Sequence, residues 1–210
     1  PIFKYILCGQ IFTVVNVTFT GSLVILNETV LPNLKALLAI EKLQVQGVKG
    51  TVGYLFIQVP DTLKHKIAES ITQLFQDGAI KTLIGTKAFL GEGWDAPCIN
   101  TLILASYVGS FVSSNQMRGR AIRVDARTPD KTGTIWHLAC LDPTATDGDK
   151  DIDKLQQRFE AFTGVSLRDE IYISNGIDRL VLPLKWSETT DLATINAEML
   201  KTAQQKSDFL

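Results

Sequence analysis

Arg120 and Arg123, in one short segment, are the residues of this sequence best suited to phosphate chemistry. They lie in residues 116–123 (QMRGRAIR), inside a helix that we expect over residues 113–123. Because an α-helix repeats every 3.6 residues, Gln116, Arg120 and Arg123 are expected on one face. Two guanidinium groups on one face form a preorganised fork for phosphate oxygens, and such arginines stabilise the charge that develops during phosphoryl transfer.

The other interpretation of this segment is a solvated basic face that forms only surface ion pairs. Gly119 argues against it, because glycine lowers helix propensity without an obvious benefit to folding. A close approach of another group to the backbone explains a glycine here better. We therefore favour a phosphate-binding helix.

A second segment combines a strand, a threonine and a glycine-rich turn. It covers residues 83–97 (LIGTKAFLGEGWDAP). Thr86 follows the expected strand 80–84, at the carboxyl end, where open α/β sheets bind ligands. The alternative role for Thr86 is to stabilise the turn with its hydroxyl. Trp94 either stacks on a base or packs beneath the turn, and the sequence leaves both open.

Together these segments resemble motifs V and VI of superfamily-2 helicases, the DEAD/DEAH-box-like group. The hydrophobic stretch 100–106 between them and the FQDG ending at residues 75–78 match the same family, and the resemblance covers about residues 22–141. It implies the C-terminal RecA-like domain of such an enzyme, a three-layer α/β fold of the P-loop NTPase type with a mostly parallel sheet. It also implies three groups of site residues: catalytic arginine fingers (Arg120 and Arg123), nucleotide-binding residues (Gln116, Gly119, Gly93 and Asp95) and nucleic-acid-binding residues (Gly85, Thr86 and Lys87).

Two of these assignments have ordinary alternatives. Asp95 faces the ribose of the nucleotide by resemblance, but an aspartate at a turn also serves as a capping residue. Lys87 adds a phosphate contact by resemblance, whereas a single exposed lysine is more often simply solvated. The contact of Thr86 would be with a backbone phosphate and therefore independent of nucleic-acid sequence.

The parts of a motor that cradle ATP are missing from this sequence. It contains no G-x-x-x-x-G-K-[ST] loop and no Asp–Glu pair after a hydrophobic strand to hold Mg²⁺. ATP and Mg²⁺ would be bound mainly by an N-terminal RecA-like domain of the same protein. We expect ATP-dependent helicase activity in the intact protein and none in this fragment alone. The first residue is Pro1, which we interpret as the start of a piece of a longer chain.

The form of the second motif points to one branch of the family. It begins with Gln116, where DEAD-box RNA helicases have histidine, and it resembles the restriction-subunit-like branch. That branch favours DNA as the partner, with RNA as the alternative. Two other hypotheses stay open: a non-catalytic nucleic-acid-binding module derived from this fold, and an unrelated α/β domain with coincidental motifs.

Strands and helices are expected to alternate along most of the chain, which predicts an α/β domain. Expected strands cover residues 11–20, 23–26, 52–59, 80–84, 101–105 and 133–139. Expected helices begin at Pro32, after Asp61 and at Ser113. We assign residues 1–141 to the RecA-like domain, 142–153 to an acidic linker and 154–210 to an accessory region. That region would contain a helix at 153–162, a strand pair at 171–184 and a last helix capped at Thr190.

Composition narrows the class of protein. A formal net charge of -1 excludes a broadly basic nucleic-acid binder, so any basic surface must be local. Three widely spaced cysteines suggest a reducing compartment, and no metal-ligand spacing occurs. No apolar run approaches the length needed to span a bilayer. We expect a cytoplasmic protein without a membrane partner.

Overall fold

The computed structural model describes residues 4–5, 17–40, 43–90, 94–105, 111–142, 146, 148–165, 173–177, 182 and 190–207. The chain divides into two compact units, one of residues 9–98 and one of residues 1–8 with 99–210. Both combine helices and strands, which confirms the α/β class. No helix in the described part of the chain is long and apolar enough to cross a membrane.

A five-stranded sheet forms the centre of the unit of residues 9–98. Its strands lie in the order β4-β5-β3-β2-β6. They are β2 (Val17–Phe19), β3 (Leu23–Asn27), β4 (Val45–Gly47), β5 (Tyr54–Gln58) and β6 (Leu83–Gly85).

This sheet is mixed rather than mostly parallel. Only β2 and β6 pair in parallel, whereas β2–β3, β3–β5 and β4–β5 pair antiparallel. The reason for the first antiparallel pair is local: residues 20–22 form a tight turn, and Gly21 adopts a φ of 94° that suits glycine. A connection this short joins only antiparallel neighbours, because parallel strands need a crossover of a dozen or more residues.

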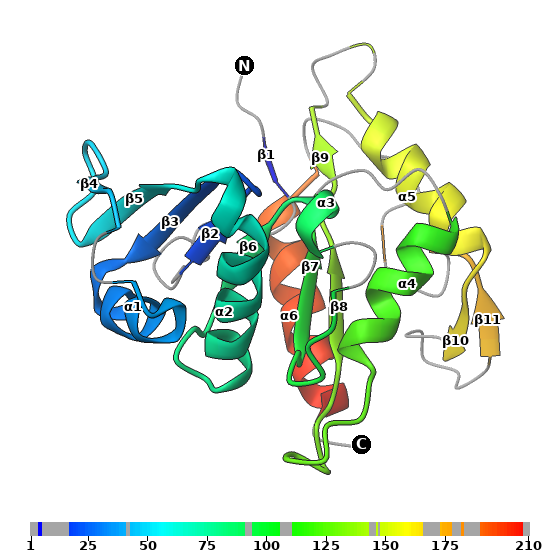
Figure 1. The fold of residues 1–210 in the computed structure, drawn as a ribbon. Coiled ribbons are helices and arrows are strands. Elements are labelled where there is room, and N and C mark those ends of the chain that lie inside the picture. Colours follow the sequence, from blue (N-terminus) through cyan, green and yellow to red (C-terminus); the bar gives the residue numbers. More distant parts are fainter. Residues whose placement is uncertain are drawn as a thin grey trace. The chain divides into compact units, whose positions relative to one another are not determined.

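Two helices lie together on one side of this sheet (Figure 1). They are α1 (Leu31–Leu38), which has Pro32 in its first turn as expected, and α2 (Lys64–Gln76). Their apolar side chains pack with alternate residues of the strands, and the fully buried members include Val17, Val24, Leu26, Leu34, Leu38, Ile57, Ile67 and Ile71. The helix α2 begins three residues after Asp61, and Asp61 does not cap it. This residue begins a 3₁₀ turn, η3 (Asp61–Leu63), and its carboxylate pairs with Lys64 at 2.6 Å.

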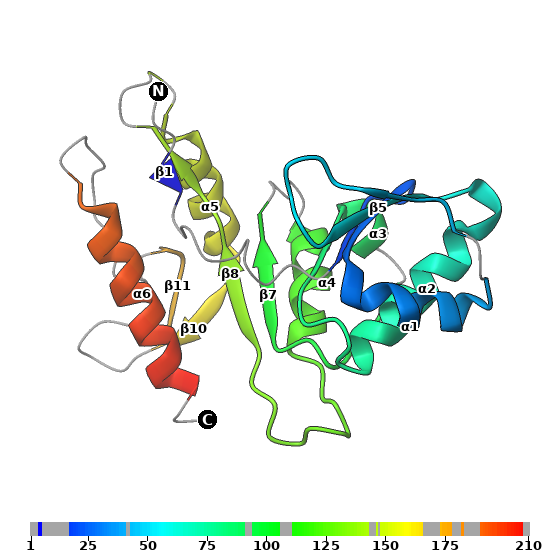
Figure 2. The same cartoon turned by 90° about the vertical axis from the view of Figure 1, so that its left-hand side faces the viewer.

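The second unit contains a parallel pair of strands and the predicted phosphate-binding helix (Figure 2). The strands are β7 (Thr101–Leu104) and β8 (Thr134–His137), and α4 (Phe111–Ala121) packs against both. An antiparallel pair, β1 (Lys4–Tyr5) and β9 (Cys140–Leu141), belongs to the same unit.

The C-terminal region forms a small apolar core with the end of β8 and β9. It contains α5 (Lys150–Glu160), β10 (Thr163–Val165), β11 (Ile173–Asn175) and α6 (Leu192–Ser207). The buried residues of this core are Ala139, Leu141, Ile152, Leu155, Phe159, Phe162 and Leu192.

Three details of this region differ from the sequence-based expectations. The helix α5 begins at Lys150, inside the predicted linker. β11 lies within the expected strand pair of residues 171–184 and pairs with the earlier strand β10, and most of the rest of that range lies outside the described residues. Asp191, not Thr190, caps α6, because its carboxylate accepts hydrogen bonds from the backbone amides of Ala193 and Thr194 at 3.0 and 3.1 Å.

Candidate functional site

Thr86 lies immediately after β6, at the start of a short helix, α3 (Lys87–Leu90). Its hydroxyl oxygen accepts a hydrogen bond from the backbone amide of Phe89 at 3.4 Å, and its carbonyl oxygen accepts from Phe89 and Leu90. The side chains of Thr86 and Lys87 are exposed. The turn-stabilising role is therefore present, and it leaves the hydroxyl hydrogen of Thr86 able to donate to an outside acceptor.

Gly85 has a structural requirement of its own. A β-carbon added there would lie 2.6 Å from Cγ of Leu90 and 3.0 Å from Cδ1 of Phe89. The last residue of β6 therefore has to be small for α3 to fold back over it. This packing explains the glycine without any ligand.

Trp94 anchors the far end of the same motif on α2. Its indole nitrogen donates to the hydroxyl of Thr72 at 2.9 Å, and its ring lies 6.4 Å from that of Phe75 and 6.3 Å from that of Phe89. Trp94 thus packs beneath the turn and is not turned outward to stack on a base. The neighbouring Asp95 has an exposed side chain.

The main chain of Asp95 is also fixed from α2, because the Gln76 amide donates to its carbonyl oxygen at 3.2 Å. Gly93 lies outside the described residues, so its assignment to the nucleotide stays a prediction. The 83–97 motif is thus tied to α2 at its C-terminal end and capped by its own threonine at its N-terminal end.

The helix α4 carries the second group of candidate residues, but it ends earlier than expected. It covers Phe111–Ala121, so Arg123 lies two residues beyond it, and the backbone amide of Arg123 bonds to the carbonyl of Arg120 at 3.4 Å. Gln116 and Arg123 are exposed, whereas Arg120 is only 8 % exposed. Of the three residues expected on one face, Gln116 and Arg123 are therefore accessible and Arg120 is not.

Among the described residues, Gly119 has no neighbour that requires a glycine. A β-carbon added there meets none of their atoms within 4 Å. The close backbone approach that we expected is not made by any described residue of this chain. The position is open and available for an approach from outside.

The C-terminal end of α4 is held by two residues that the motif comparison did not single out. The ammonium group of Lys131 donates to the carbonyl oxygens of Ala121 and Ile99. Gly133 passes so close to the same end that a β-carbon there would lie 2.5 Å from the carbonyl oxygen of Ala121. A cation at the last carbonyl of a helix interacts favourably with the negative end of the helix dipole. The sequence of residues 124–133 by itself does not predict this contact.

The loop after α4 is built around a buried aspartate. Asp125 is 6 % exposed, and its carboxylate accepts hydrogen bonds from the backbone amide of Arg127 at 3.1 Å and from its guanidinium at 3.4 Å. The hydrogen bond from the backbone amide of Arg127 holds the pKa of Asp125 below its ordinary value. Burial acts in the opposite direction, and the guanidinium of Arg127 lowers this pKa further. The loop is thus ordered by an ionised carboxylate.

The candidate residues fall into two groups on different units. Gly85, Thr86, Lys87 and Asp95 belong to residues 9–98, whereas the residues of α4 and the following loop belong to the other unit. Among the described residues, no group of three or more His, Cys, Asp or Glu side chains is placed to hold a metal ion. The chemistry that the two groups offer is hydrogen bonding and positive charge, both suited to phosphate oxygens.

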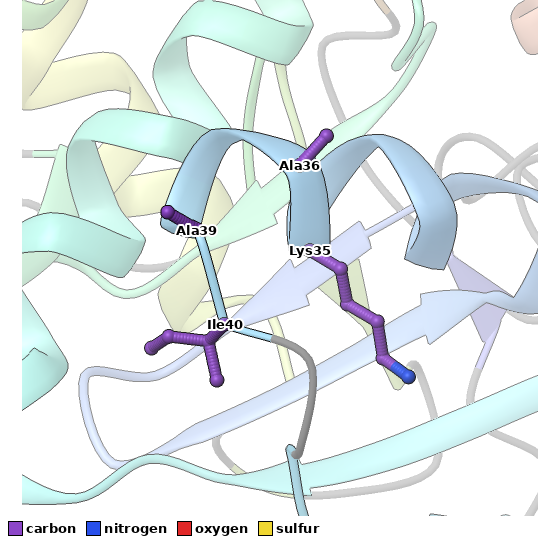
Figure 3. Close-up of a pocket in the computed structure, with 4 residues that line it drawn as sticks. All are labelled: Lys35, Ala36, Ala39 and Ile40. Atoms are coloured by element: carbon purple, nitrogen blue, oxygen red, sulfur yellow. The ribbon is translucent and has the colours of Figure 1, made fainter.

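A surface hollow lies at the end of α1, in the unit of residues 9–98 (Figure 3). It is lined by Lys35, Ala36, Ala39 and Ile40. Among the described residues of this lining Lys35 has the only charged side chain, so they offer no set of converging polar groups. It is not a candidate site.

Comparison with known families gave one match. The family model described as helicase conserved C-terminal domain matches residues 16–125, more than half of the chain. The matched segment contains both motifs and ends inside the loop that follows α4. No curated protein and no solved structure matches the chain.

Proposed function

The chain belongs to the helicase conserved C-terminal domain family, and from this premise we propose that it is the second motor domain of an ATP-dependent, DNA-acting helicase or translocase. The observation that carries the proposal is the outer side of α4. There Gln116 is exposed, Gly119 leaves open space beside the backbone among the described residues, and Arg123 is exposed two residues beyond the end of the helix. A nucleotide held by another domain would find amide and guanidinium donors on one accessible side.

In this proposal Arg120 and Arg123 act as arginine fingers. A guanidinium close to the γ-phosphate stabilises the charge that builds up in the transition state, and no covalent step is required of it. Arg123 is the accessible member, whereas Arg120 is largely buried and needs less reorganisation to hold its position. Gln116, on the same helix, would contact the nucleotide as well, and Asp95 keeps the ribose-binding role that the resemblance implies.

ATP and Mg²⁺ would be held mainly by an N-terminal RecA-like domain. The donor set of this chain supports that division of labour. The candidate residues of α4 are guanidinium and amide groups, which fit phosphate oxygens rather than a metal ion. ATP bound between the two domains would supply the free energy for movement along nucleic acid.

Thr86 and Lys87 would contact the nucleic-acid backbone. Both side chains are exposed at the carboxyl end of β6, and a hydroxyl and an ammonium group at such a position read phosphates rather than bases. The choice of DNA rests on Gln116 at the start of the second motif, which resembles the restriction-subunit-like branch. Stimulation of ATP turnover by double-stranded DNA, and not by RNA of matched length, is the expected result.

The decisive experiment replaces each arginine in the full-length protein. Arg123→Ala and Arg120→Ala should each lower ATP turnover by about 10³- to 10⁵-fold, the usual worth of an arginine finger, while ATP binding stays close to wild type. Arg127→Ala serves as the matched control, because Arg127 is an exposed arginine of the loop that follows α4 and the variant keeps the backbone amide that bonds to Asp125. Wild-type turnover in both finger variants would remove the catalytic assignment.

A further inference from the structure

The side of α4 opposite the proposed phosphate site is held by the C-terminal region. The guanidinium carbon of Arg118 lies 3.6 Å from the centre of the Phe162 ring. At this distance a guanidinium over the face of an aromatic ring is attracted by the ring quadrupole. A guanidinium nitrogen of Arg118 also donates to the side-chain oxygen of Asn115 at 3.3 Å, which fixes the direction of the arginine along the helix.

Phe162 is itself locked in place by the packing around it. It is buried, and the ring of Phe159 packs edge-on against it with the centroids 6.0 Å apart. The ring of Phe159 meets the ring of His137 at 5.2 Å, and a guanidinium nitrogen of Arg158 lies 2.9 Å from Nδ1 of His137. A continuous set of contacts thus runs from β8 through α5 to Phe162 and then to α4.

Helix geometry separates this contact from the proposed phosphate site. Each residue of an α-helix turns by about 100°, so Arg118 lies about 160° around the helix from Gln116. Gln116 is exposed and Gly119 has open space beside its backbone among the described residues, whereas Arg118 is half-buried beside Phe162. The contact therefore fixes the rotation of α4 about its own axis without occupying the side that would meet a nucleotide.

We propose that Phe162 is a positioning residue for the arginines of α4, and that the C-terminal region acts as a bracket that sets the orientation of this helix through the Arg118–Phe162 contact. The proposal rests on the proposed function of α4. Phe162 lies beyond residue 125, where the family match ends, so the bracket is a feature of this chain's own C-terminal region. Its role would be to hold the finger arginines in the geometry that the transition state requires.

The test compares aromatic and aliphatic side chains at position 162 in the full-length protein. Phe162→Leu keeps an apolar residue but removes the ring face, so kcat for ATP should fall roughly ten- to hundredfold through misplaced arginines. The KM for ATP should change by no more than about twofold, because the ground-state contacts are untouched. Phe162→Tyr keeps the ring face and should retain kcat near the wild-type value.

Phe159→Leu is the matched control, since it makes the same substitution in the same apolar core and removes one packing partner of Phe162 but keeps the ring face of Phe162 beneath Arg118. It should lower kcat far less than Phe162→Leu even if it lowers the thermal unfolding temperature as much. Arg118→Met should reproduce the loss of kcat, and combining it with Phe162→Leu should add little, as expected for two halves of one interaction.

Three results would overturn the bracket: wild-type kcat in Phe162→Leu, equal losses of kcat in both leucine variants, or no rescue by tyrosine. Failure of the bracket is distinguishable from failure of the proposed function. If Arg123→Ala abolishes turnover while Phe162→Leu does not, only the bracket is wrong. If neither arginine of the finger pair affects turnover, the proposed function is wrong as well.

Discussion

The ammonium nitrogen of Lys131 lies 3.1 Å from the carbonyl oxygen of Ala121, the residue at which α4 ends, and 2.8 Å from the carbonyl oxygen of Ile99. One cation thus joins the end of the arginine-bearing helix to the segment that leads into β7. The lysine lies ten residues further along the chain than Ala121. This contact and the close approach of Gly133 both lie at the last residue of α4. They therefore fix the point from which the chain continues to Arg123.

Lys131→Met should lower the stability of the 210-residue chain. The change removes two charge-assisted hydrogen bonds and leaves two carbonyl oxygens without this donor, so we expect a loss of about 1–3 kcal/mol in the free energy of unfolding. Urea denaturation followed by circular dichroism measures it. Lys64→Met is the control, because the ion pair of Lys64 with Asp61 is exposed and its loss should matter much less. An equal effect of both variants would contradict the capping role of Lys131.

Two glycines near this helix should respond in opposite ways to alanine. Gly133→Ala places a methyl group against the carbonyl of Ala121, and we expect a loss of about 1–3 kcal/mol of stability from overpacking. Gly119→Ala meets open space within α4 and should stabilise the chain by up to about 1 kcal/mol through helix propensity. The same urea titrations compare the two.

Gly119→Ala also separates folding from function. If the open space beside Gly119 receives a nucleotide in the intact motor, the more stable variant should have lower ATP turnover in the full-length protein. A variant that is both more stable and fully active would show that Gly119 is not part of the nucleotide site.

The chain should bind nucleic acid weakly and without sequence preference. A two-domain motor divides its track between its halves, so one half alone loses most of the combined affinity. Thr86→Val removes the hydroxyl and should weaken binding by the same factor for unrelated oligonucleotides. Fluorescence anisotropy over a salt series measures this, with a shallow salt dependence expected from few phosphate contacts. Thr62→Val, at another exposed threonine, is the control; tight binding to one sequence would refute the assignment of Thr86.

Stability should fall in acid in a way that depends on Asp125. Its folded-state pKa is lowered chiefly by the amide of Arg127, so the stabilisation is fully present above the unfolded pKa of about 3.9 and is lost as pH falls through the lower folded value. The difference in unfolding free energy between wild type and Asp125→Asn should therefore shrink as the pH is lowered from 6 toward about 3. Asp61→Asn, at an exposed carboxylate, should show a smaller pH-dependent difference. A constant difference across this range would contradict the pKa assignment of Asp125.

Isolated from any other domain, the chain should not turn over ATP. Its sequence lacks a phosphate loop, so nothing orients the γ-phosphate for attack. A coupled assay of phosphate release from the purified 210-residue chain tests this. Steady turnover that disappears in Arg120→Ala would show that the chain contains a complete site.

Local sequence was sufficient for the elements that carry the candidate motifs. The apolar stretch before Thr86 and the helical segment around Gly119 produced β6 and α4 within two or three residues of the expected bounds. Such elements depend on backbone preferences and on periodicity, which neighbouring residues determine. The α/β class followed from the same patterns.

Tertiary structure decided how these elements pair and what holds them. The hairpin at Gly21 turned a sheet expected to be mostly parallel into a mixed one, because strand direction depends on the length of each connection and on which edges meet. The partners of α4, Lys131 at its end and Phe162 behind it, are 10 and 44 residues from Ala121 and Arg118. Hydrogen bonds and ring contacts act over a few ångströms of space, and a linear pattern contains no information about which distant residues the folded chain will bring within that range.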